Sequence, residues 1–246
     1  MVIKNGRIRY VRDPASFRIQ PSEPAPAPAL HRASRENVEG LGRLVHSVHL
    51  PDFHGRLSVA MPAAARQARV IEVLPDQVLT RSRLLAVSDL NNAGVCATAV
   101  IERHGKNGNL GTGLVLGLGL REGALASTVA HDSHNLIVAG RDATSMELAV
   151  QTVAAMGGGL AVTSGGQVLA SLPLPIGGLM SPLSAAEVSA AYEKLEAAAA
   201  SLGCTLPAPF ITLSFLALPV IPELRLTDCG LVDVNAFALI SPWIEN

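Results

Sequence analysis

Apolar and polar positions change their pattern along the chain, and after the first quarter they indicate regular strands and helices. Residues 69–74 and 78–87 mix apolar and polar positions as strands do, and residues 95–102 form a largely apolar run typical of a buried strand. Two further apolar runs, 124–130 and 136–139, flank a motif of five polar residues. We therefore expect a sheet whose strands are joined by short polar loops.

Two segments have the spacing of helices. In residues 142–156 the apolar positions fall on overlapping helical faces, and the glycines at 157–159 would end the helix in a left-handed conformation. Residues 184–202 begin with Ser184 and have Glu187 three positions later, which is the signature of a capping box. A glycine follows directly after residue 202, so both helices have a predicted beginning and end.

The remaining segments favour short strands. Residues 160–163 and 167–172 flank a Ser-Gly-Gly turn and predict a hairpin. From Phe210 onward the chain is apolar with repeated prolines, which predicts short strands and turns. The fold class that results is α+β, a mixed α/β arrangement in which one or more mixed sheets carry flanking helices. We assign this domain to residues 45–246.

The N-terminal part differs in composition. Residues 2–10 predict two short strands around an Asn-Gly turn, a strong hairpin signal. Residues 21–28, with the sequence PSEPAPAP, predict an extended Pro-rich linker, and a short helix is expected near residues 37–45. Residues 1–44 are therefore interpreted as a hairpin remnant and a Pro/Ala-rich linker that precede the larger domain.

Composition narrows the class of partner. Hydrophobic residues make up 49% of the 246 positions, so a sizeable core can form, and the net charge of −1 carries no basic excess for nucleic acid. No apolar run approaches the roughly 20 residues that span a bilayer. The three cysteines form no CxxC pair. We expect a cytoplasmic protein that binds neither nucleic acid nor membrane.

The five-residue motif between the two apolar runs is the first candidate site. It consists of His131, Asp132, Ser133, His134 and Asn135. On a helical turn the two histidines would share a face and could bind one metal ion, whereas on a strand they would point to opposite faces. A loop is the setting that the flanking runs favour. There the motif contacts a substrate or an interface, or it is a structural turn in which Asp132 and Asn135 bond backbone amides.

A second candidate, Glu102-Arg103-His104-Gly105-Lys106, follows a strand-like run. A histidine next to Arg and Glu could transfer protons, while the alternative is an exposed charged turn shaped by glycines. The glycines of residues 111–119 lack the spacing of a dinucleotide fingerprint, and no HExxH, GxSxG or P-loop motif occurs. No complete catalytic apparatus can be assembled from the sequence.

Several long segments in the same order resemble one family. The similarity covers residues 68–80, 99–140, 156–162, 172–181 and 209–234. These segments resemble the C-terminal domain of bacterial adenine deaminase, a hydrolase of the metal-dependent amidohydrolase superfamily. The resemblance implies an enzyme of purine metabolism that converts adenine and water to hypoxanthine and ammonia. In that family manganese or iron in a (β/α)₈ barrel lowers the pKa of a bound water.

The chain departs from the family pattern in one respect. Family members carry the barrel, with its His-x-His metal ligands, before this domain, and no His-x-His pair occurs in these 246 residues. The segment MVIKNGRIRYV resembles the last strands of the small β-domain that follows the barrel. We therefore expect the chain to begin just after the barrel. The family's metal ligands are therefore not transferred, and we assign no cofactor to this chain. Manganese or iron would belong to the complete enzyme.

These observations leave three hypotheses. In the first, the chain is an adenine deaminase C-terminal portion that needs a separately encoded barrel chain, and the isolated chain has little or no activity. In the second, it is a non-catalytic module that binds a purine or another small ligand. Independently of these hypotheses, the chain could form a homo-oligomer. In the third and least favoured, it is an enzyme with a metal ion at His131 and His134. The residues expected to contact substrate or partner are Arg103, His104, Lys106, His131, Asp132, His134 and Asn135.

Overall fold

The computed structural model describes residues 2–4, 7–9, 45 and 47–245, and the chain divides into two units, Met1–Glu39 and Gly40–Asn246. In the first unit, β1 (Val2–Lys4) and β2 (Arg7–Arg9) pair antiparallel, with Ile3 opposite Ile8. This pairing confirms the predicted hairpin strands. The predicted linker at 21–28 and all but the last residue of the predicted helix at 37–45 lie outside the described residues.

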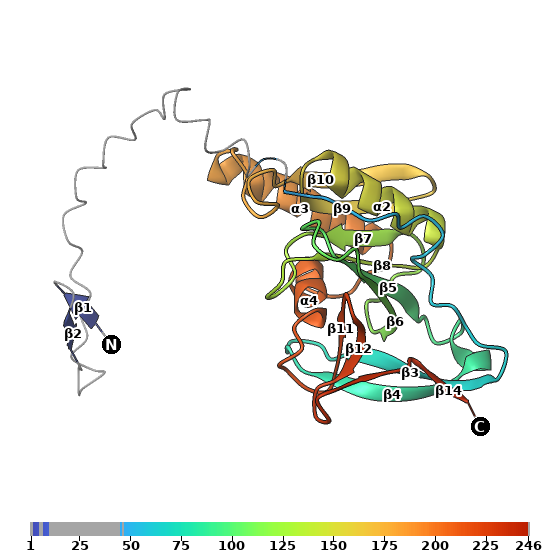
Figure 1. The fold of residues 1–246 in the computed structure, drawn as a ribbon. Coiled ribbons are helices and arrows are strands. Elements are labelled where there is room, and N and C mark those ends of the chain that lie inside the picture. The colour runs from blue at the N-terminus through green and yellow to red at the C-terminus, as the bar shows by residue number, and fades with distance from the viewer. Residues whose placement is uncertain (1, 5–6, 10–44, 46, 246) are drawn as a thin grey trace. The chain divides into compact units, whose positions relative to one another are not determined.

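A nine-stranded mixed sheet forms the framework of the second unit (Figure 1). Its strands lie in the order β10-β9-β7-β8-β5-β6-β3-β14, and β4 pairs with β3. Their bounds are β3 Ala65–Val73, β4 Thr80–Ala86, β5 Cys96–Ile101, β6 Leu110–Leu116, β7 Ala124–Ser127, β8 Leu136–Gly140, β9 Gly159–Ser164, β10 Gln167–Pro173 and β14 Trp243–Glu245. The β3–β6 pair is parallel and the other pairs are antiparallel. The expected mixed sheet is confirmed.

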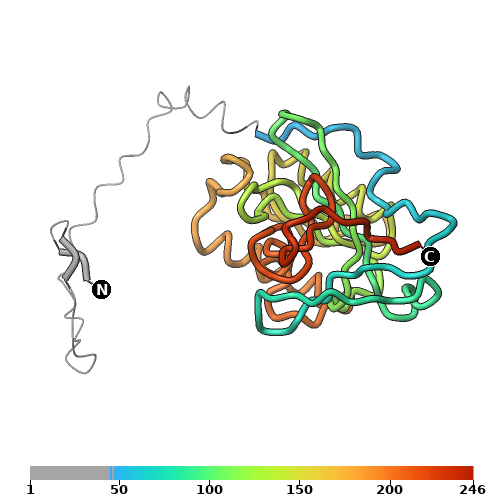
Figure 2. The backbone as a smooth tube through the Cα atoms, turned by 60° about the horizontal axis from the view of Figure 1, so that its bottom comes forward, coloured from blue at the N-terminus to red at the C-terminus, as the bar shows by residue number. Residues whose placement is uncertain are grey.

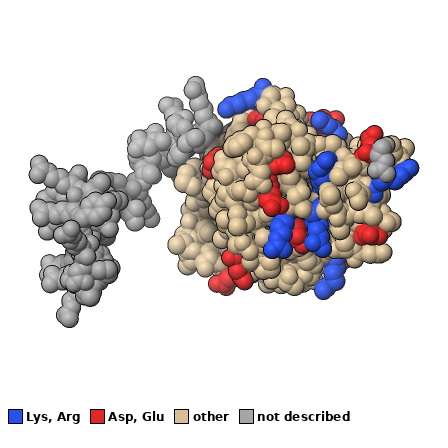
Figure 3. Space-filling model, turned by 90° about the horizontal axis from the view of Figure 1, so that it is seen from below, with Lys and Arg blue, Asp and Glu red and all other residues tan. Residues whose placement is uncertain are grey.

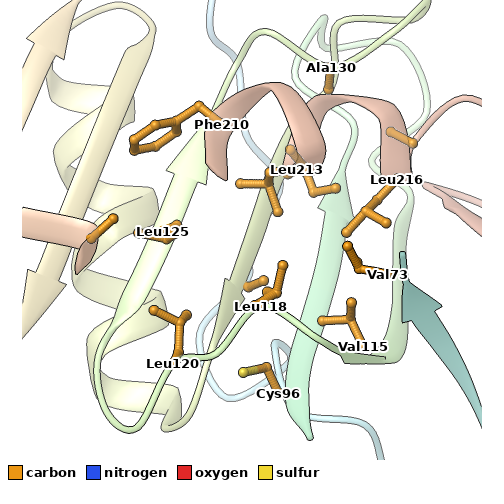
Figure 4. Packing of buried hydrophobic residues seen from close by; sticks show 14 of the residues in the cluster. Val73, Cys96, Val115, Leu118, Leu120, Leu125, Ala130, Phe210, Leu213 and Leu216 are labelled. Carbon is orange, nitrogen blue, oxygen red and sulfur yellow. The ribbon is translucent and has the colours of Figure 1, made fainter. Parts of the chain in front are cut away.

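Helices cover both faces of this sheet. Successive strand residues point to opposite faces. Leu125 packs with the residues of α3 (Ala185–Ser201) and α4 (Pro209–Leu216), while Ala126 packs with those of α2 (Ala143–Ala155). Figure 4 shows side chains of α4 reaching onto the strands on the first of these faces. Each of these two faces therefore carries its own cluster of buried residues, and a third cluster includes Trp243 of β14.

Local signals set the ends of the two predicted helices. The Asp142 side chain accepts a hydrogen bond from the backbone N–H of Ser145 at the start of α2. At the start of α3, Ser184 and Glu187 form both bonds of the capping box that the sequence predicts. Each cap satisfies a backbone donor that has no partner within the helix.

The expectation of only strands and turns after Phe210 is wrong for its first part, which forms α4. Its sequence, PFITLSFL, is rich in β-branched and aromatic residues, and its apolar positions show no helical period. Tertiary packing overrides these preferences, because α4 buries residues on several sides against the sheet. Pro209 at the first turn fixes a helical φ and was the available signal.

The rest of that segment does form strands. β11 (Leu224–Thr227), β12 (Gly230–Asp233) and β13 (Ala238–Ile240) make a small antiparallel sheet that lies against β6. The chain then returns to pair β14 with β3, and Figure 2 shows this C-terminal segment crossing the folded unit. A short 3₁₀ helix at Val87–Asp89 completes the elements.

The surface carries no long basic stripe on the face that Figure 3 shows, where small groups of Lys and Arg alternate with Asp and Glu among uncharged residues. Among the described residues, no helix combines the length and the apolar character that crossing a membrane requires.

Candidate functional site

Two hairpin loops meet at one end of the large sheet. One joins β5 to β6 and comprises residues 102–109; the other joins β7 to β8 and comprises residues 128–135. Ile101 at the end of β5 lies opposite Leu136 at the start of β8, because these strands are antiparallel neighbours. The register therefore brings together the two motifs that the sequence separates by about thirty positions.

Glu102 organises the 102–109 loop from inside. Its carboxylate accepts backbone hydrogen bonds from His104 at 2.6 Å, Lys106 at 3.0 Å, and Asn107 and Gly108 at 3.3 Å each. Burial by itself raises the pKa of Glu102, but these N–H donors outweigh burial and leave the pKa below its ordinary value. Glu102 is only 3% exposed, so it shapes the loop rather than presenting a charge to solvent.

Arg103 connects three segments of the chain. Its guanidinium donates to the carbonyl oxygen of His134, to that of Ser47 at 3.2 Å and to that of Gly177 at 2.9 Å. Its side chain is 1% exposed, and burial lowers its pKa from the ordinary value. An alanine Cβ at Gly178 would lie 2.7 Å from one guanidinium nitrogen, so the glycine is what admits the arginine. The interpretation of this motif as an exposed charged turn is thus wrong for Glu102 and Arg103, and Arg103 presents no free side chain to a ligand.

His104 and Lys106 are the more accessible members of the same loop. The Nε2 atom of His104 lies 2.8 Å from the carbonyl oxygen of Ser133, which joins this loop to its neighbour. Residues 49 and 104 form an isolated parallel bridge, so His49 extends the same edge. Lys106 is exposed. These side chains can reach a partner or substrate that approaches this end of the sheet.

The His131–Asn135 motif lies in a turn, neither helix nor strand. The His131 ring lies 4.9 Å from the Phe215 ring and 5.6 Å from the His134 ring, measured between centroids. Asp132 is exposed. Among the described residues neither Asp132 nor Asn135 accepts a backbone bond through its side chain, which contradicts the purely structural alternative. The Ser133 hydroxyl accepts a 3.5 Å bond from the backbone of Asn135 instead.

Unpartnered polar atoms concentrate at this turn. In the described part of the chain, four buried side-chain atoms have no hydrogen-bond partner, and three of them are His134 Nδ1, Asn135 Oδ1 and Ser214 Oγ. The Ser214 carbonyl accepts the backbone N–H of His131 at 3.3 Å, so α4 abuts the turn. Burial, followed by the charges of His131 and Arg103, lowers the pKa of His134. A neutral imidazole with a free buried nitrogen results.

This donor set does not fit the metal centre that the family resemblance implies. Within residues 47–245, no group of three or more His, Cys, Asp or Glu side chains is arranged to hold an ion. His131 and His134 come together at the turn, but Asp132 points to solvent and Asn135 is buried. We therefore derive no reaction step through a metal bound by these residues.

The sequence missed several residues that complete this region. Ser47 and the Gly177-Gly178 pair hold Arg103, and Phe215 and Ser214 of α4 lie against His131. The glycine pair within an otherwise apolar segment was a usable signal for close approach of another group. The other contacts come from remote segments and have no local signature.

Comparison with known proteins identifies the family. The model of the adenine deaminase C-terminal domain matches residues 75–238, which include both loops. The chain belongs to this family. Within the adenine deaminase C-terminal domain family, the protein from Methanococcoides burtonii named adenine deaminase is 49% identical over 185 residues, which are 72% of this chain. Those from Dehalococcoides mccartyi and Desulfatibacillum aliphaticivorans are 46% and 42% identical over 80% and 97% of it.

The matched relatives are much longer than this chain. The alignments cover 32%, 36% and 40% of the three proteins, so the chain spans little more than a third of their length. The two loops described above therefore belong to the C-terminal domain of this family, while most of each relative lies outside the similarity.

Proposed function

We propose that this chain is the accessory C-terminal portion of an adenine deaminase and that a metal-binding barrel from outside these 246 residues supplies the catalytic centre. The observation that supports this most directly is the alignment, which places the chain on about a third of its relatives' length and within their C-terminal domain family. The family reaction would be hydrolysis of adenine to hypoxanthine and ammonia.

The paired loops are the surface that we assign to the barrel. Among the candidate residues, His104, Lys106, His131 and Asp132 are accessible there. Arg103 positions both loops from beneath through its contacts with backbone carbonyls. Loops held on a rigid sheet are common binding surfaces, because the scaffold fixes their geometry. The role of these residues is contact with the barrel and its purine substrate rather than bond cleavage.

The free cysteines support a cytoplasmic location for this function. Cys96 and Cys204 are buried, Cys229 is exposed, and none of them is paired. Unpaired thiols are typical of a reducing compartment.

The proposal is tested with the purified chain and a barrel. The chain alone, supplied with adenine and Mn²⁺ or Fe²⁺, should release no ammonia above background. When the chain is mixed with a relative's barrel from which the C-terminal domain has been removed, the chain should co-purify with the barrel and restore deamination. The variant His131→Ala should weaken that association. The control variant His54→Ala should not, because His54 is exposed and lies beside α2. Ammonia release by the chain alone would refute the proposal, and so would an association that His131→Ala leaves intact.

A further inference from the structure

A cavity of about 270 Å³ lies behind His131, between the sheet and helices α3 and α4. Its floor comes from β7, β9 and β10 and its walls from the two helices. Ile211 lines the cavity and is 55% exposed, so the cavity opens to solvent. We infer that this cavity binds a neutral planar heteroaromatic molecule of one or two fused rings, such as a nucleobase.

The size and charge of the lining limit the ligand. Pockets for drug-sized molecules run from about 300 to 1,000 Å³, so this one suits a smaller molecule. No Lys, Arg, Asp or Glu side chain is among the lining residues. A phosphate or carboxylate would therefore be desolvated without a counter-charge, which is costly. The interior of the cavity thus favours an uncharged ring over a charged group.

The side chains at the cavity favour an aromatic ring over an aliphatic one. The rings of Phe210 and Tyr192 lie 6.1 Å apart, and His131 contributes a third ring to the lining. Figure 4 shows Phe210 extending from α4 beyond the packed leucines of that helix. Aromatic pairs in offset or tilted geometry gain about 0.5–1.5 kcal/mol beyond their area burial. A flat guest can contact several of these rings at once.

The polar groups require hydrogen-bonding atoms on the edge of that ring. Ser214 is 3% exposed and lines the cavity, yet its hydroxyl has no partner among the described residues. The phenol of Tyr192 is a donor at neutral pH, as tyrosine ordinarily is, and burial, followed by the charge of Glu196, raises its pKa further. A buried hydroxyl without a partner loses free energy that a suitable acceptor or donor restores. A heteroaromatic edge supplies such atoms, whereas a hydrocarbon ring does not.

This inference is independent of the barrel and goes beyond the accessory role. The test therefore uses the 246-residue chain alone, titrated with adenine and with hypoxanthine by calorimetry, and with cyclohexanol as an aliphatic ring of similar width. Saturable binding of a base, with cyclohexanol much weaker, is the expected result. Ser214→Ala should weaken binding about tenfold, the loss of roughly one hydrogen bond. The control Ser189→Ala, at an exposed position of the neighbouring helix α3, should leave it unchanged.

A second variant keeps the inference testable if Ser214→Ala disturbs α4. Val188→Phe adds volume from α3 into the cavity and should abolish base binding while circular dichroism stays native. Absence of saturable binding at millimolar base overturns the inference, as does binding that neither Ser214→Ala nor Val188→Phe affects. The inference would also be overturned if Val188→Phe lost its association with the barrel while the unmodified chain bound no base. In that case a side chain of the partner would occupy the cavity.

Discussion

Replacing Gly178 by alanine should destabilise the protein much more than the same change at its neighbour Gly177. Both glycines have left-handed backbones, with φ of +72° and +66°. A Cβ at Gly177 would meet nothing within 4 Å, whereas one at Gly178 would lie 2.7–2.9 Å from three atoms of the Arg103 guanidinium. The pair therefore isolates the contact with Arg103 from the cost of the backbone conformation.

The size of the stability loss depends on the hydrogen bonds that Arg103 would lose. The left-handed conformation costs alanine about 1–2 kcal/mol at either position. An exposed arginine could swing aside, but Arg103 is buried and donates to carbonyl groups of three segments. Moving it breaks at least one hydrogen bond from a charged donor, which is worth about 1.5–3 kcal/mol. Gly177→Ala should thus cost about 1 kcal/mol and Gly178→Ala about 3 kcal/mol.

Urea unfolding followed by circular dichroism measures both costs, because the midpoint shifts while the slope stays constant if only stability changes. If the two variants differ by less than about 0.5 kcal/mol, Arg103 is not confined against Gly178, and the guanidinium does not join the loops in the way described. That outcome would also remove the basis for calling Arg103 a positioning residue.

Three further predictions concern the same sheet. His134 has a lowered pKa, so the folded state resists its protonation, and stability should fall as the pH drops below about 6.5, the pKa of histidine in the unfolded chain. The variant His134→Asn should flatten that fall in thermal melts between pH 5 and 8. Asparagine is chosen because it tolerates the φ of +50° at this position. An unchanged profile would refute the assignment. Glu102→Gln should cost about 2 kcal/mol in urea unfolding at pH 7, since the amide can satisfy fewer of the four N–H donors. The cost should diminish as the pH falls below about 4.3, the ordinary glutamate pKa, toward the lowered pKa of folded Glu102. A cost that does not diminish at low pH would contradict this. Gly111→Ala should displace the small sheet, because its Cβ would lie 2.7 Å from the backbone nitrogen of Gly230. Gly113→Ala should be far milder, because the nearest atom to its Cβ would be a side-chain methyl of Leu226 at 3.2 Å. Equal melting temperatures of the two variants would argue against that packing.

The sequence alone predicted the elements whose signals are local. Strand periodicity, the capping box of Ser184 and Glu187, and the paired strands around the N-terminal turn each depend on residues within a few positions of one another. The mixed sheet with flanking helices followed from these elements. The segment PFITLSFL was misjudged because its preference for strand was overridden by burial on several sides of α4.

The candidate site was only partly predictable. The sequence identified both polar motifs, but it could not show that Arg103 is buried and His104 accessible. Arg103 makes its bonds to residues 31, 56 and 74 positions away, and no local pattern records such partners. The same holds for Ser214, whose closeness to His131 depends on where α4 packs.

The sequence by itself determined the family, most of the secondary structure and the two motifs at strand ends. Only the tertiary structure decided that the motifs lie side by side, that the charges of Glu102 and Arg103 support the loops from inside, and that a cavity opens behind His131. The physical reason is that periodicity and caps act over a few residues, whereas burial and unpaired polar groups depend on contacts between distant segments.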